Sequence, residues 1–106
     1  MTNGKQHPRP PSGQTATSRG QEARQAVAAY HETEPAALVE RVGAAIDRFR
    51  DGELDALGVD QALFQYSRAA KELWKFCNLG DPELTASIMR ERPAVDWWER
   101  GAPRKR

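Results

Sequence analysis

The apolar residues between positions 59 and 77 recur at alternating spacings of four and three, and this spacing limits the fold more than any other feature. An α-helix makes one turn every 3.6 residues, so side chains at these spacings form one stripe that packs against another helix at a shallow angle. We therefore expect a long amphipathic helix that ends at Asn78 and Gly80. The stripe consists of Val59, Leu63, Tyr66, Ala70, Leu73 and Cys77.

A second amphipathic helix is predicted directly before it. Thr33, followed by an acidic residue and Pro35, is a helix start signal, and Gly52 is a stop signal. The connector to the next helix is short, so the two helices should pack as an antiparallel hairpin, with Leu54 and Leu57 tucked back onto it. Six apolar residues of the first helix share an arc of about 120°: Leu38, Val39, Val42, Ala45, Ile46 and Phe49.

A short third helix is predicted after the hairpin. Asp81 is a typical N-cap, Pro82 suits the first helical position, and Pro93 stops the helix. Its apolar edge, Leu84 and Ile88 with Met89, should cover part of the second helix. Such cover is needed because four further residues widen the apolar arc of the second helix to about 160°: Ala62, Ala69, Trp74 and Phe76.

The ends of the chain differ from this centre in composition. Residues 1–20 consist mainly of Pro, Gly, Ser, Thr, Gln and basic residues, which bury too little surface to offset the entropy of ordering. We expect a disordered tail there, a short helix or linker over residues 21–32, a helical domain over residues 33–92, and a Trp-containing basic tail of irregular structure over residues 93–106. The predicted fold is all-α: an antiparallel two-helix hairpin plus a short third helix.

Length and charge indicate one small protein domain in the cytoplasm. The 106 residues include no apolar run of the roughly 20 residues that cross a bilayer, and the N-terminus lacks the apolar core of a secretory signal. The single cysteine, Cys77, can form no internal disulfide. Residues 1–30 carry four basic and one acidic residue, a net +3, whereas residues 31–79 carry six basic and nine acidic residues, a net −3.

Residue patterns for metal binding or catalysis are weak. The acidic connector invites comparison with a calcium loop, but Ala56 stands where the required glycine belongs and Ala62 where the required glutamate belongs. His31 and Cys77 are far apart in sequence, and Cys77 falls in phase with the apolar stripe, as a buried small residue does. We therefore expect no metal site, no cofactor and no catalytic residues, and so no enzyme.

Phe64 is the anomaly of the second helix. It lies about 150° from the centre of the apolar arc, on the side that carries Arg68, Lys71 and Lys75. An aromatic ring beside cations can bind a protein partner or pack against the chain's own tryptophans. It can also bind nucleic acid, with the cations on phosphates and the ring stacked on a base. In the remaining alternative, the ring is simply exposed to solvent.

The predicted function is a small non-catalytic protein–protein interaction module with a regulatory or accessory role. An accessory nucleic-acid-binding protein that uses the basic stripe is the alternative, and no membrane partner is expected. A homodimer is also expected, because an uncovered flank of the second helix should pair with a second copy. The predicted partner-binding residues are Phe64, Arg68, Lys71, Trp74, Lys75, Phe76, Trp97 and Trp98.

Overall fold

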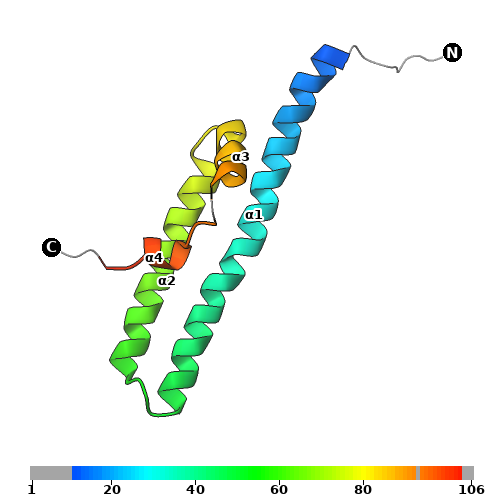
Figure 1. Ribbon diagram of the computed structural model, residues 1–106. Coiled ribbons are helices and arrows are strands. Elements are labelled where there is room, and N and C mark those ends of the chain that lie inside the picture. The colour runs from blue at the N-terminus through cyan, green and yellow to red at the C-terminus, as the bar shows by residue number, and fades with distance from the viewer. Residues whose placement is uncertain (1–10, 93, 104–106) are drawn as a thin grey trace.

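The computed structural model describes residues 11–92 and 94–103, which form four helices. They are α1 (Pro11–Arg50), α2 (Ala56–Asn78), α3 (Pro82–Glu91) and α4 (Trp97–Arg100). The helices α1 and α2 lie side by side and antiparallel, and α3 and α4 pack over one face of this pair (Figure 1). The predicted all-α fold is confirmed.

Helix α1 is much longer than the sequence predicts. It begins at Pro11, so the expected start at Thr33 is wrong, and residues 11–20 are helical where we expected disorder; residues 1–10 of that predicted tail lie outside the described residues. The Thr33 hydroxyl caps no helix and donates to the carbonyls of Ala29 and Tyr30 within the same helix. Pro35 removes one helical hydrogen bond, but the helix continues through it.

Local capping signals are placed as the sequence predicts at two boundaries. Gly52, just after α1, adopts a positive φ of 80°, a conformation that favours glycine. Asp81 caps α3, since its carboxylate accepts a hydrogen bond of 3.1 Å from the Leu84 amide. Asp55 caps α2 in the same way, so α2 begins at Ala56, earlier than the first residue of the predicted stripe.

The described helices enclose two small apolar clusters. The larger one joins Leu38 of α1, Leu73 and Ala69 of α2, and Trp97 of α4. The smaller one lies between α1 and α3, where Ala86 packs against Ala23 and Val27. The third helix therefore extends the core along α1, which gives residues 20–30 a packing partner and explains why α1 continues beyond the hairpin.

The buried side of α2 differs from the predicted stripe, because α4 packs against α2 as well as α1. Leu73 is buried as expected, but Leu63 is 45% exposed, and Ala69 is fully buried because α4 lies against it. The prediction for Leu57 is also wrong: it is exposed, whereas Leu54 is half-buried. A helix that contacts two neighbours at an angle to each other centres its buried arc between them.

Candidate interaction surface

Residues 94–103, which we call the C-terminal strap, are fastened across the α1–α2 hairpin. The Trp97 indole N–H donates to the Tyr30 hydroxyl at 2.7 Å, and the Gln65 amide donates to the Trp98 carbonyl at 2.8 Å. The Arg68 guanidinium Nε donates to the Gly101 carbonyl at 2.6 Å. The predicted irregular C-terminal tail therefore contains a short helix and a fixed strap.

Trp97 and Phe76, two of the predicted binding residues, contact each other within the chain. Trp97 is buried, and its ring centroid lies 5.2 Å from that of Phe76, which in turn lies 5.8 Å from that of Tyr30. Burial raises the pKa of the Tyr30 phenol, while the hydrogen bond from Trp97 acts in the opposite direction. The three rings thus pack against one another at the larger apolar cluster, where Tyr30 and Phe76 are half-buried.

Gly101 permits the close approach of the strap to α2. A Cβ atom at this position would lie 2.5 Å from both the Gln65 carbonyl oxygen and the Ala69 amide nitrogen. Backbone atoms cannot move aside as a flexible side chain can, so any larger residue would push the strap outward.

Several of the other predicted binding residues are partly engaged within the chain. Trp98 is half-buried, and the Arg41 guanidinium lies 5.7 Å from its ring centroid. Arg68 is held by the Gly101 carbonyl as described, and Lys75 Nζ lies 3.2 Å from a carboxylate oxygen of Glu72. These contacts reduce the number of cations on α2 that are available to a phosphate backbone.

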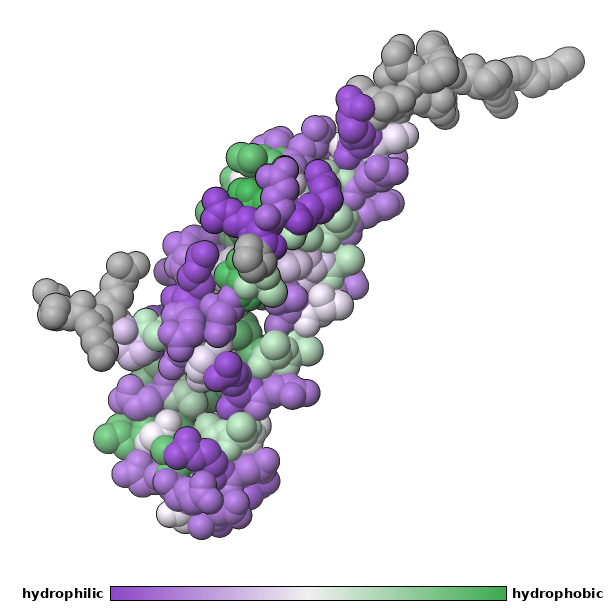
Figure 2. Space-filling view, in the orientation of Figure 1, coloured by the Kyte–Doolittle hydropathy of each residue, from purple (hydrophilic) through white to green (hydrophobic). Residues whose placement is uncertain are grey.

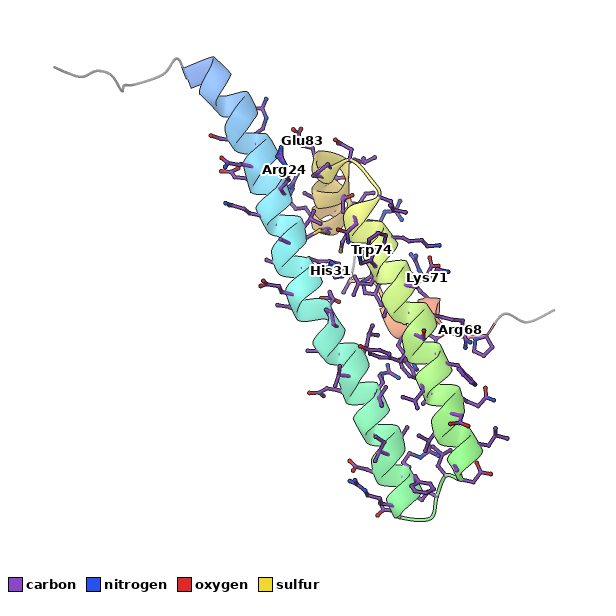
Figure 3. The ribbon with its side chains drawn as sticks, turned by 180° about the vertical axis from the view of Figure 1, so that it is seen from behind. Arg24, His31, Arg68, Lys71, Trp74 and Glu83 are labelled. Carbon is purple, nitrogen blue, oxygen red and sulfur yellow. The ribbon has the colours of Figure 1, made fainter. Side chains whose placement is uncertain are left out.

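The outer edge of α2 is the side that faces away from α1, and it comprises Leu57, Phe64, Arg68, Lys71 and Lys75. Figure 3 shows Arg68 and Lys71 pointing away from α1 on this edge. Phe64 is 56% exposed and Leu57 is 63% exposed. The two lie seven residues apart, two helical turns, so they form an interrupted apolar strip with Asp60 and Gln61 at the turn between them. The basic residues of the edge lie beyond its Phe64 end.

The back face of the hairpin is the face opposite α3 and α4. On α1, Val39 and Ile46 lie about 140–160° around the helix from Arg41, which faces the strap. On α2, Leu63 and Trp74 lie about 160–180° around from Gln65, which also faces the strap. The back face comprises Pro35, Val39, Val42, Ile46, Leu63, Ala70 and Trp74, which are half-buried or exposed.

The back face exposes large apolar side chains. On the face that carries α3 and α4, hydrophilic residues form most of the surface, with smaller hydrophobic areas between them (Figure 2). On the back face, Val39 is 55% exposed and Trp74 is 50% exposed. Figure 3 looks onto the back face and labels Trp74 there.

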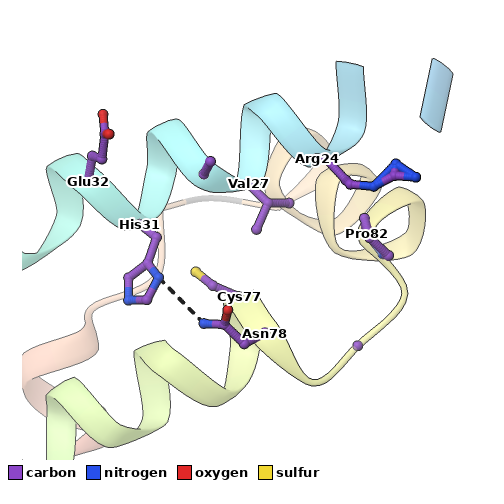
Figure 4. Close-up of a pocket in the computed structure, with 9 residues that line it drawn as sticks. Arg24, Val27, His31, Glu32, Cys77, Asn78 and Pro82 are labelled. Carbon is purple, nitrogen blue, oxygen red and sulfur yellow. Dashed lines mark hydrogen bonds between the residues drawn. The ribbon is translucent and has the colours of Figure 1, made fainter. Parts of the chain in front are cut away.

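An open groove of about 580 Å³ lies where the end of α2 meets α1. His31 Nδ1 lies 3.5 Å from the Asn78 amide nitrogen across this groove, and Arg24 and Cys77 also line it (Figure 4). Burial raises the pKa of the Cys77 thiol, so it remains protonated at neutral pH and is a weak nucleophile. The described residues contain no group of three or more His, Cys, Asp or Glu side chains that could hold a metal ion.

Comparison with known proteins identifies no relative: no family model, no curated protein and no solved structure matches the chain. In the part of the chain that the structure describes, no helix is long and apolar enough to cross a membrane.

Proposed function

We propose that this protein is a small non-catalytic interaction module that binds a protein partner through the outer edge of α2. The observation that carries the proposal is that Phe64 and Leu57 are both exposed, two helical turns apart, on one edge of a helix whose opposite side is buried. Large apolar side chains grouped on a surface mark protein contacts more often than single exposed residues do. We place the module in the cytoplasm, since its single cysteine can form no internal disulfide.

The chemistry of the edge indicates the kind of partner. Lys71 is exposed beyond the Phe64 end of the apolar strip, so a complementary segment would present apolar side chains with an acidic residue near that end. Burying the exposed halves of Phe64 and Leu57 contributes about 1 kcal/mol each. A strip of this size fits a small, transient interface with a regulatory or accessory role.

The nucleic-acid alternative has less support. Of the three cations beside Phe64, Arg68 holds the strap and Lys75 forms an ion pair with Glu72. Among these three described side chains, Lys71 is the one with neither an ion pair nor a hydrogen bond recorded.

Affinity capture with matched variants tests the proposal. Phe64→Glu places a charge on the outer edge, while Leu63→Glu places the same charge on the adjacent residue, which lies on the back face. A partner protein that co-purifies with the wild type and with Leu63→Glu, and is lost with Phe64→Glu, would support the proposal. Recovery that is equal for all three proteins would contradict it.

A salt titration separates the two functions. Three phosphate contacts would make affinity for a single-stranded oligonucleotide fall by about 10- to 40-fold between 50 and 200 mM salt. Binding of the captured protein should change by only a few-fold over this range, because apolar burial depends little on salt. Oligonucleotide binding with the steep dependence, lost in Phe64→Glu, would favour the alternative.

A further inference from the structure

The back face of the hairpin has a shape and size that suit a second copy of the chain. Helix α2 has 23 residues and is therefore about 35 Å long, and two helices packed side by side present a face about 20 Å wide. Such a face covers about 700 Å², close to the roughly 800 Å² that each partner buries in a standard stable interface. The described helices leave this face bare, since α3 and α4 both pack on the other side (Figures 1 and 3).

A self-complementary arrangement follows from the position of the apolar residues along the two helices. The α1 part of the back face is centred between Val39 and Val42, and its α2 part is centred near Ala70. Contacts between Tyr30 and Phe76 and between His31 and Asn78 fix the register of the hairpin. Counting from these contacts puts Val39 and Ala70 at the same level, so both halves of the back face share one centre.

We propose that two copies of this chain pair through their back faces about a two-fold axis near Val39, forming an antiparallel four-helix bundle with the two hairpin loops at opposite ends. This proposal goes beyond the function proposed above, because it uses a different surface. An isologous contact of this kind uses the same patch on both subunits, and packing two hairpins face to face is a common route to a helical bundle.

Charge complementarity favours opposite ends over the same end. The end of α1 and the loop after it, positions 47–55, carry four acidic and two basic residues, a net −2, although Glu53 is paired with Arg48 at 3.6 Å. Helix α1 is about 60 Å long and extends past the end of α2, where Arg24 lines the groove described above. With the axis near Val39, the acidic loop of one copy lies at the level of Arg24 in the other, whereas the same-end arrangement brings the two acidic loops together.

Sedimentation of matched variants tests the pairing. At about 100 μM the wild type should sediment with a mass near twice 11.9 kDa. Leu63→Glu and Trp74→Glu should weaken dimerisation by about 100-fold or more, because each would bury an unpaired charge. Phe64→Glu is the control: it adds the same charge at a similarly exposed position on the outer edge, and should leave the dimer intact.

Circular dichroism shows whether each variant stays helical. Two back-face variants are included, so that if one of them misfolds the other still tests the pairing. A monomeric wild type at 100 μM would overturn the proposal. So would a Phe64→Glu variant that loses the dimer as completely as the two back-face variants. Partner binding that Phe64→Glu retains would instead contradict the function proposed for the outer edge, and it would leave the pairing through the back faces unaffected.

Cross-linking tests the direction of pairing. In a Cys77→Ser background, Val39→Cys should form a disulfide-linked dimer under mild oxidation, because the two-fold axis brings the two copies of residue 39 together. Glu40→Cys is the neighbouring control and lies on a different side of α1, so it should remain reduced. Equal cross-linking at both positions, or none at residue 39 in a protein that sediments as a dimer, would overturn the opposite-end arrangement.

Discussion

Replacement of Trp97 by alanine tests whether the C-terminal strap contributes to the folded state. Trp97 is 5% exposed and contacts Phe76 and the Tyr30 hydroxyl, so the substitution removes a ring from the larger apolar cluster and a hydrogen-bond donor from Tyr30. Trp97 joins α4 to both helices of the hairpin, which are far from it in sequence.

The expected loss follows from the buried area. A buried tryptophan removes roughly 200 Å² from water, worth about 5 kcal/mol at 25 cal/mol per Å². Alanine retains part of that burial and the cavity relaxes in part, so we expect Trp97→Ala to lower the free energy of unfolding by about 3–5 kcal/mol. A chain of 106 residues has a total stability of about 5–15 kcal/mol, so the variant should be close to unfolding.

Urea denaturation followed by far-UV circular dichroism measures this loss. Trp97→Phe and Tyr30→Phe, alone and combined, isolate the hydrogen bond, and their coupling energy should be about 0.5–1.5 kcal/mol. A loss below about 1 kcal/mol for Trp97→Ala, at protein concentrations held equal, would refute the reasoning and show that the strap contributes little to the core.

Three further predictions concern positions whose surroundings differ clearly. Gly101→Ala should destabilise the protein by about 1–3 kcal/mol, because the new methyl group meets the α2 backbone. Gly43→Ala lies in open space within α1 and should stabilise the protein by up to about 1 kcal/mol. Melting temperatures that shift in the same direction for both variants would contradict this. Leu73→Ala should lower the free energy of unfolding of the monomer by about 2–5 kcal/mol, and Leu63→Ala should lower it by about 1 kcal/mol or less. Denaturation at low protein concentration measures both losses. Equal losses would show that the buried side of α2 is wrongly assigned. The folded-state pKa of Tyr30 lies above its ordinary value of 10.0, so the stabilisation linked to the neutral phenol is complete below pH 10 and is lost as the pH rises through the folded-state pKa. Tyr30→Phe should remove that part of the alkaline loss of stability, and an unchanged pH profile would argue against it.

The candidate site was partly predictable from the sequence. Phe64 and Lys71 are exposed as the helical period indicates, because the period requires only the approximate direction of the core. Trp74, at the edge of the predicted apolar arc, is also half-exposed. Trp97 and Phe76 were assigned to a partner because their actual contacts are long-range: Trp97 and Tyr30 are 67 residues apart. One local signal was available, since Asp96 caps α4 by accepting a hydrogen bond from the Glu99 amide.

The sequence by itself determined the helical class, the hairpin turn at Gly52 and the start of α3 at Asp81, because backbone geometry and capping depend on neighbouring residues. The tertiary structure decided where α1 begins and which side of α2 is buried. The start signal at Thr33 and Pro35 is worth only a few kcal/mol, and packing of α1 against α3 opposes it. Likewise, the helical period of α2 specifies an apolar stripe but not which helices pack against it. Ala69 is buried because α4 packs against it, while Leu63 stays exposed.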